Sequence, residues 1–246
     1  MNQHYFWKQR NNLPDDIGYN QFSIKHLMML IGVILFTVLM TYAYIHLNME
    51  ARVLLRRAIA IVLILSEIMK LLVIHFNHGD VLNYIPIEIC SIGAYCIVID
   101  AFSAEPTFVR VMLLVLFLPA AIMALIYPTT VEYPVWNFFT LHQFLFHGLI
   151  VAYVIALFVS KEIAIGYGDV WKSIFTIIGI ASIVYLIDRI FHRNYMFLTY
   201  DEENKMLHRL TILSGGGIKY TLTLVLFCVL MIHVFYFIFK LIEMLL

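Results

Sequence analysis

Residues 111–127 read VMLLVLFLPAAIMALIY, a stretch without a single charged side chain. Its apolar residues follow one another without the alternation that a half-buried β-strand would show. About 20 consecutive apolar residues are what an α-helix needs to cross the hydrocarbon core of a bilayer. The stretch therefore predicts a membrane-spanning helix, and several other parts of the sequence resemble it.

The composition of the whole chain is that of a membrane protein. Of its 246 residues, 63% are hydrophobic and 13% are charged, whereas soluble proteins are roughly half apolar and a quarter charged. The 16 basic and 16 acidic side chains cancel, so the sequence predicts no basic surface for nucleic acid. We expect membrane lipid as the surroundings of this chain and exclude nucleic acid as a partner.

Seven apolar segments divide the chain, each bounded by charged residues, Pro or Gly. None shows the strict alternation of a transmembrane β-strand. The segments are 25–46, 53–75, 85–103, 109–127, 138–160, 170–191 and 219–242. The sequence thus predicts an all-α polytopic membrane protein with seven transmembrane helices, forming one domain over residues 1–246.

Two longer stretches lie outside these segments, a polar N-terminal tail over 1–24 and a connection over 192–218. The connection holds an acidic cluster, Asp201, Glu202 and Glu203, and a glycine run from Gly215 to Gly217. Glycines can turn the chain freely before the last helix. We expect this connection to be a loop or a mobile cap.

The basic residues of the short connections predict the orientation, because such residues gather on the cytoplasmic side. With the N-terminus outside, the short outer connections at 76–84 and 128–136 carry no basic residue. The inner connections then carry Arg52, Arg56, Arg57, Arg110, Lys161 and Lys172. The tail and the 192–218 connection contain further basic residues, which a loop that folds back would engage. We predict a bacterial cell-membrane protein with its N-terminus outside and its C-terminus inside.

Polar residues within the apolar segments are the candidates for a functional site, since an ionisable group costs about 2.5–3.5 kcal/mol inside a bilayer. Glu67 and Lys70 stand three residues apart, on one face of the second helix. The others are Glu88 and Cys90 in the third segment, His142, Gln143 and His147 in the fifth, and Asn194 and Tyr195 after the sixth. In the predicted orientation they converge on the outer half of the membrane, which indicates a polar cavity.

Simpler interpretations stand beside this one. Glu67 and Lys70 form either a structural ion pair, which we favour, or part of a site. A lone buried cysteine is usually a small hydrophobic residue, and an odd number of cysteines in apolar segments is no disulfide framework. We favour a site role for His147, because Gln143 stands one turn earlier as an orienting partner.

The depths of two candidates can be estimated from the rise of about 1.5 Å per helical residue. Cys90 would lie about 9 Å below the start of its segment, and His147 about 15 Å below its own. A helix tilt of about 20° would bring both to one level.

No motif of a soluble enzyme and no cofactor-binding motif is present. His142 and His147 are five residues apart, which separates them by about 140° around a helix and does not suit one metal ion. A metal site would need histidines from different helices, and we expect neither a metal nor a cofactor.

Three short motifs occur in the order expected for a known family. They are Ile85-Pro86-Ile87-Glu88-Ile89-Cys90, then Asn137-Phe138-Phe139 with Phe146-His147-Gly148, then Asn194-Tyr195-Met196-Phe197-Leu198. Over most of its length the chain resembles the YwaF-type, transmembrane protein 164-like membrane proteins. The resemblance implies seven helices and a phospholipid acyltransferase that uses a cysteine and a histidine.

His147 matches the histidine of that family, whereas the cysteine departs from the pattern. Bacterial members have His at the position of Glu88, and the family cysteine stands at the position of Ile87. Cys90 lies three residues later, one turn deeper on nearly the same face of a helix. It is equivalent by geometry alone.

Our leading hypothesis is therefore a lipid acyltransferase in which Cys90 accepts an acyl group and His147 is the general base. Lys70, His142 or Asn194 would stabilise the oxyanion. The rival is a transporter or ligand-binding protein with a site formed by Glu67, Lys70, Glu88 and His147. A third hypothesis is a metal-dependent lipid hydrolase that uses His75, His78, His142 and His192. The ligand would be a phospholipid or a small molecule, and the sequence indicates neither the substrate nor the oligomeric state.

Overall fold

The structure is a computed structural model that describes residues 5–104, 107–200 and 205–245. Helices and their connections make up these ranges, with no strand among the described residues. The predicted all-α class is thereby confirmed. The acidic residues Asp201, Glu202 and Glu203 lie outside the described ranges.

Seven apolar helices or helical rods occupy the seven predicted segments. They are α1 (Ile24–His46), α2 (Met49–Phe76), α3 (Ile89–Phe102), a rod of α4 (Thr107–Met112), η4 (Leu113–Phe117) and α5 (Leu118–Ile126), α6 (Phe138–Val159), α7 (Tyr167–Phe191) and α9 (Gly217–Leu245). Within the described ranges, six are long and apolar enough to cross a membrane, and α3 is shorter. This agrees with a seven-helix membrane protein.

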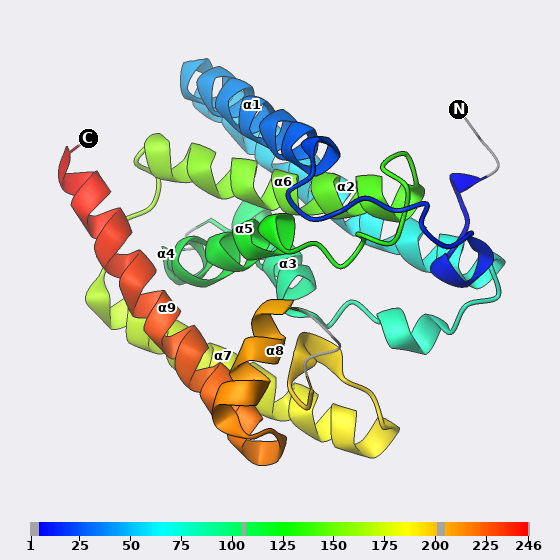
Figure 1. Ribbon diagram of the computed structural model, residues 1–246. Coiled ribbons are helices and arrows are strands. Elements are labelled where there is room, and N and C mark those ends of the chain that lie inside the picture. The colour runs from blue at the N-terminus through cyan, green and yellow to red at the C-terminus, as the bar shows by residue number, and fades with distance from the viewer. Residues whose placement is uncertain (1–4, 105–106, 201–204, 246) are drawn as a thin grey trace.

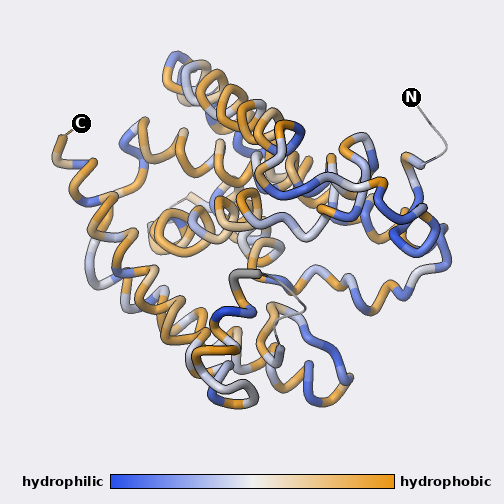
Figure 2. Tube along the Cα trace, in the orientation of Figure 1, coloured by the Kyte–Doolittle hydropathy of each residue, from blue (hydrophilic) through white to orange (hydrophobic). Residues whose placement is uncertain are grey.

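The helices are arranged around α6 and the α4–η4–α5 rod (Figure 1), with α1 and α2 on one side and α7 and α9 on the other. Of the 18 most apolar consecutive residues of α6, 67% are buried, compared with 6% in α1. Apolar residues run along the helices, while polar residues gather at their ends and in the connections (Figure 2). Lipid tails are as apolar as leucine, so the exposed apolar side of α1 is suited to contact with lipid.

Helix α3 begins four residues later than predicted, and Pro86 explains the difference. Proline disfavours helical backbone at Ile85 before it, and the Ile87 N–H group bonds to the Ile85 carbonyl at 2.8 Å in a turn, so the helix starts only at Ile89, with Glu88 as its N-cap. Its 14 residues span about 21 Å, less than the roughly 30 Å of the hydrocarbon core. The predicted depth of Cys90 was therefore wrong, because Cys90 is the second residue of the helix.

A second proline shapes the central rod. Pro119 lies in the first turn of α5, and the turn before it, η4, is a π-helix. The proline ring clashes with the carbonyl four residues earlier, that of Val115, and offers that carbonyl no N–H donor. A widened turn relieves this clash. All five residues of η4 are buried, so the irregular turn stands in the core.

The described parts of the 192–218 connection, 192–200 and 205–218, are partly helical. They contain the short η5 (Tyr195–Phe197) and a ten-residue helix, α8 (Lys205–Ser214), whose Leu207 is buried in a small core with residues of α7 and α9. The three glycines that follow have φ of +82°, +79° and +58°, and they turn the chain into α9. Two further short helices, η2 (Arg10–Asn12) and η3 (Val81–Tyr84), precede α1 and α3.

An ion-pair cluster joins the helices where α2 begins and where α3 and α6 end. Glu162 follows α6, and its carboxylate oxygens lie 3.2 Å from Arg52 Nη1 and 2.9 Å from Arg56 Nη1. Arg110 Nε lies 2.6 Å from Asp100 Oδ1, and its Nη2 lies 3.8 Å from Glu162. Three of the basic residues that predicted the orientation are thus held in ion pairs inside the bundle.

Candidate functional site

A polar cavity of about 540 Å³ lies where α2 ends and where α3 and α6 begin. Its lining includes all nine candidate residues from the sequence: Glu67, Lys70, Glu88, Cys90, His142, Gln143, His147, Asn194 and Tyr195. These residues come from four separate parts of the chain, and the expected polar cavity is confirmed.

Glu67 is the charged centre of this cavity. Its Oε2 lies 2.7 Å from Lys70 Nζ, and its Oε1 lies 3.7 Å from His142 Nε2 on α6. The side chain of Glu67 is 5% exposed and that of Lys70 is 14% exposed, so the pair is buried in the bundle. The ring of His142 also stacks on Phe146, with centroids 5.5 Å apart. The predicted ion pair is present, and through His142 it contacts α6.

His147 lies five residues further into α6 than His142. Its Nδ1 is 2.7 Å from the backbone carbonyl of Gln143. A carbonyl oxygen can only accept a hydrogen bond, so Nδ1 carries the proton and Nε2 carries the lone pair. Gln143 therefore orients the histidine through its backbone. Its side chain instead donates to the carbonyl of Ala124 at 3.1 Å and ties α6 to α5.

Cys90 lies in the first turn of α3, buried and facing the same cavity. Backbone N–H groups in the first turn of a helix have no partner within that helix, and the helix dipole is positive there. Both features stabilise a thiolate, whereas burial disfavours it. The N-cap residue Glu88 makes no side-chain capping bond to this turn, so its carboxylate does not occupy these N–H groups.

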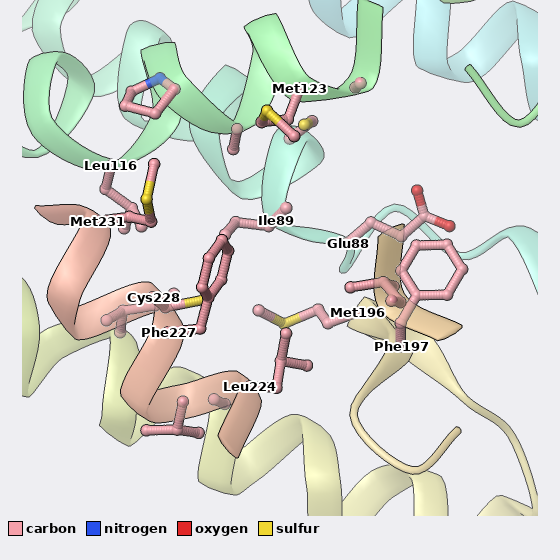
Figure 3. A pocket seen from close by; sticks show the side chains of 18 of the residues that line it. Glu88, Ile89, Leu116, Met123, Met196, Phe197, Leu224, Phe227, Cys228 and Met231 are labelled. Atoms are coloured by element: carbon pink, nitrogen blue, oxygen red, sulfur yellow. The ribbon is translucent and has the colours of Figure 1, made fainter. Parts of the chain in front are cut away.

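A second cavity, of about 290 Å³, adjoins the polar one and is almost entirely apolar. Leu116 and Met123 of the central rod lie on one side of it, and Phe227, Cys228 and Met231 of α9 lie on the other (Figure 3). The residues that line both cavities are Glu88, Cys90, Thr129, Gln143, His147 and Phe197. Cys90 and His147 therefore stand at the junction of a polar and an apolar space.

Several lining residues belong to connections that sequence reasoning passed over. Thr129, Thr130 and Tyr133 lie between α5 and α6, and Arg193 follows α7. The signal available was a connection without Lys or Arg and rich in hydroxyl groups, which suits a partly inward-facing loop better than a solvated one. Burial raises the pKa of Tyr133 and of Tyr195, so both hydroxyl groups stay protonated near neutral pH.

Other candidates lie apart from the cavity or serve another contact. His75 and His78 are not among the lining residues, although His192 is. In the described ranges, no group of three or more His, Cys, Asp or Glu side chains could hold a metal ion. Asn194 makes a hydrogen bond within its own loop, because its Oδ1 accepts from the backbone N of Thr199 at 2.9 Å.

Comparison with known proteins gives one match. No curated protein and no solved structure matches the chain, but one family model does. The model of the TMEM164 family matches residues 21–239, a range that begins before α1 and ends within α9. It supports the transmembrane protein 164-like resemblance indicated by the three motifs, whereas the YwaF-type naming stays a prediction. Since the match covers most of the sequence, the chain belongs to the TMEM164 family.

Proposed function

We propose that this membrane protein is a lipid acyltransferase in which Cys90 carries the acyl group and His147 moves the protons. The observation that carries the proposal is the position of both residues at the junction of the two cavities. A phospholipid has a polar headgroup and apolar chains, joined near ester carbonyl groups. A lipid with its headgroup in the polar cavity and one chain in the apolar cavity would present an ester at this junction.

The first half of the reaction transfers the acyl group to the protein. His147 Nε2 accepts the proton of the Cys90 thiol, and the thiolate attacks the ester carbonyl. When the tetrahedral intermediate collapses, the ester C–O bond breaks. The leaving lipid oxygen takes the proton from His147. The products of this step are a lysolipid and a thioester on Cys90.

The second half passes the acyl group on. The hydroxyl group of an acceptor lipid attacks the thioester carbonyl and gives its proton to His147 Nε2. The C–S bond then breaks, and Cys90 leaves as a thiolate that regains its proton from His147. The hydrogen bond from Nδ1 to the Gln143 carbonyl supports this cycle, because it keeps Nε2 as the basic nitrogen.

The first turn of α3 supplies donors for the negative oxygen that forms in both halves. The N–H groups of Ile89, Cys90 and Ser91 precede the first bond within the helix, which runs from Ile92 N to the Glu88 carbonyl at 3.0 Å. Fixed N–H donors near a reacting carbonyl are the usual form of an oxyanion hole. We infer that these backbone N–H groups, rather than Lys70, His142 or Asn194, form the oxyanion hole.

The orientation predicted from the short connections indicates the side of the membrane on which this reaction takes place. With the N-terminus outside, the polar cavity opens toward the outer leaflet. We propose that leaflet as the source of both the donor and the acceptor lipid.

The test is to trap the thioester on the purified protein. Proteoliposomes are given a phospholipid with an alkyne-tagged acyl chain, and the protein is analysed by mass spectrometry with and without neutral hydroxylamine. We expect a hydroxylamine-labile acyl group on Cys90. His147→Ala should slow its formation by roughly 10²- to 10⁴-fold, the usual contribution of a general base. Cys96→Ala and Cys228→Ala are the matched controls and should keep the adduct.

Two outcomes would contradict the proposal. One is acyl transfer that persists in Cys90→Ala. The other is a silent Cys90→Ser combined with a loss of solute uptake in Glu67→Gln, which is the pattern of the rival transporter hypothesis, because transport needs the carboxylate and not the thiol.

A further inference from the structure

Two short segments far apart in the sequence meet at the polar cavity. One is 80–84, which includes η3, and the other is 192–200, which follows α7; residues of both line the cavity. Arg193 joins them, with Nη2 2.7 Å from Asp80 Oδ2 and a second hydrogen bond to Asn83. The Tyr195 hydroxyl also donates to the carbonyl of Leu82.

The 192–200 segment is built as one compact unit. Asn194 Oδ1 accepts from the backbone N and the hydroxyl of Thr199, at 2.9 Å and 2.6 Å, and Asn194 Nδ2 donates to the carbonyl of Tyr200 at 2.9 Å. One side chain thus closes the loop on itself. A loop closed in this way can shift as a whole without losing its internal bonds.

Backbone strain is concentrated in the same loop. His192, Met196 and Phe197 have φ of +54°, +58° and +55°, a region that residues other than glycine rarely adopt. Such conformations persist only where the surrounding contacts enforce them, and they gather at switching and ligand-binding segments. In this loop the strain favours release once a restraining contact is lost.

The contacts of loop 192–200 with its neighbours differ in strength from one side of the loop to the other. Toward α7 and α9 they are hydrogen bonds to Asp188, Tyr220 and Thr221, between 2.8 and 2.9 Å, and Asp188 and Tyr220 are buried. Toward segment 80–84 the ion pair of Arg193 with Asp80 has side chains 28% and 44% exposed. Exposed ion pairs contribute little stability, because water competes for both partners. The ion pair of Arg193 with Asp80 is therefore the weakest of these contacts, weaker than the bond from the buried Tyr195 to the Leu82 carbonyl on the same side.

We propose that loop 192–200 is a lid on the polar cavity, hinged on α7 and α9 and latched to segment 80–84 by Arg193. Release of the latch leaves the hydrogen bond from Tyr195 to the Leu82 carbonyl, and when this bond also opens, the two segments part and admit a polar ligand to Cys90 and His147. Phe197 lines both cavities, so the same movement widens their junction. The lid does not depend on the proposed acyl transfer, since it controls access whatever the cavity binds.

The experiment uses Cys90 as a reporter of opening. In a Cys96→Ala, Cys228→Ala background, the rate at which a small water-soluble maleimide modifies Cys90 is followed by mass spectrometry on the purified protein. Asp80→Asn and Arg193→Gln each remove the ion pair of the latch, and the side-chain oxygen that Asp80→Asn leaves can still accept from Leu82 N as Asp80 does. We expect either variant to raise the rate roughly two- to five-fold, as for the loss of one exposed ion pair.

The design separates opening from a simple charge effect on the thiol. Removing a negative charge at position 80 and a positive charge at position 193 would change the thiolate population in opposite directions, whereas opening raises the rate in both variants. The double variant should react no faster than the faster single variant, because both substitutions break the same contact. Glu132→Gln is the control, since it breaks another exposed pair, with Arg10, at 2.9 Å.

Three results would overturn the lid. They are unchanged rates in both latch variants, rates that move in opposite directions, and an equal rise in Glu132→Gln. The last would mean that any loosening of the surface exposes Cys90. Thermal unfolding of each variant shows that the protein compared is folded.

Discussion

Glu67 is a buried carboxylate of the polar cavity, and it is paired with a cation. Its carboxylate lies between Lys70 on its own helix and His142 on α6, and the side chain is nearly inaccessible. A buried charge is tolerated when it is paired, and it becomes costly when its partner is removed. The stability of this region therefore depends on both members of the pair being present or absent together.

The first prediction concerns this pair. Glu67→Gln or Lys70→Met alone leaves an uncompensated buried charge and should lower the free energy of unfolding by about 3–5 kcal/mol. The double substitution should cost less than the sum of the two single ones. Denaturant unfolding of the purified protein in detergent measures all three.

The chain offers a matched control for this prediction. Lys240 and Glu243 are also three residues apart and 2.7 Å from each other, but their side chains are 41% and 36% exposed. Their removal should change the stability by less than about 1 kcal/mol. Equal losses at the two pairs, or additive losses at Glu67 and Lys70, would show that burial of the pair is not what matters.

At the scale of elements, Glu162 links helices that are distant in the sequence. It receives Arg52 and Arg56 from α2, and the Tyr44 hydroxyl of α1 donates to it at 3.0 Å. Arg110 donates to the Glu162 backbone carbonyl at 2.9 Å and extends the contact to α4. Glu162 thus links α1, α2 and α4 to the end of α6, at the end of the bundle opposite the polar cavity.

We therefore predict a large effect of Glu162→Gln. Two largely buried arginines would lose their counter-charge, so the free energy of unfolding should fall by about 3–5 kcal/mol. Thermal unfolding in detergent or nanodiscs measures the change. Lys172→Gln, which removes an exposed pair with Asp169, is the control and should be nearly neutral. A similar loss in both variants would mean that the cluster around Glu162 is only a surface feature.

At the scale of the whole molecule, the bundle has two different ends. One end holds the polar cavity and the lid, and the other holds the Glu162 cluster. Because three arginines of the second end are held in ion pairs, counting basic residues gives less information on orientation than the sequence suggested. The N-out orientation is therefore a prediction to be tested on the protein in cells.

Cysteine accessibility provides that test. In a background with Cys90→Ser, Cys96→Ala and Cys228→Ala, a membrane-impermeant maleimide should label Asn11→Cys on intact cells. It should label Glu50→Cys only after permeabilisation. Both positions are exposed, at opposite ends of α1. Labelling of the Glu50 position from outside would reverse the orientation, and with it the leaflet that supplies the lipid.

Local chemistry in the sequence was enough to predict most helices and the polar residues that line one cavity. Long uncharged runs mark spans, because charged side chains are costly in hydrocarbon. These spans are helices, because a bilayer offers no partner for free backbone groups. Buried polar residues mark the cavity, because each costs free energy inside a membrane. Hydropathy placed the start of α3 four residues too early, because the turn at 85–87 is as apolar as the helix that follows it.

From the sequence alone one can predict the membrane surroundings, the helical class, the approximate places of the seven apolar helices and the nine polar residues that line one cavity. The packing of the helices decides that a second, apolar cavity meets the first at Cys90 and His147, and that Arg193 reaches Asp80. The two kinds of feature differ in their range along the chain. Hydropathy and proline act within one segment, whereas a cavity and a latch depend on how helices separated by a hundred residues pack against one another.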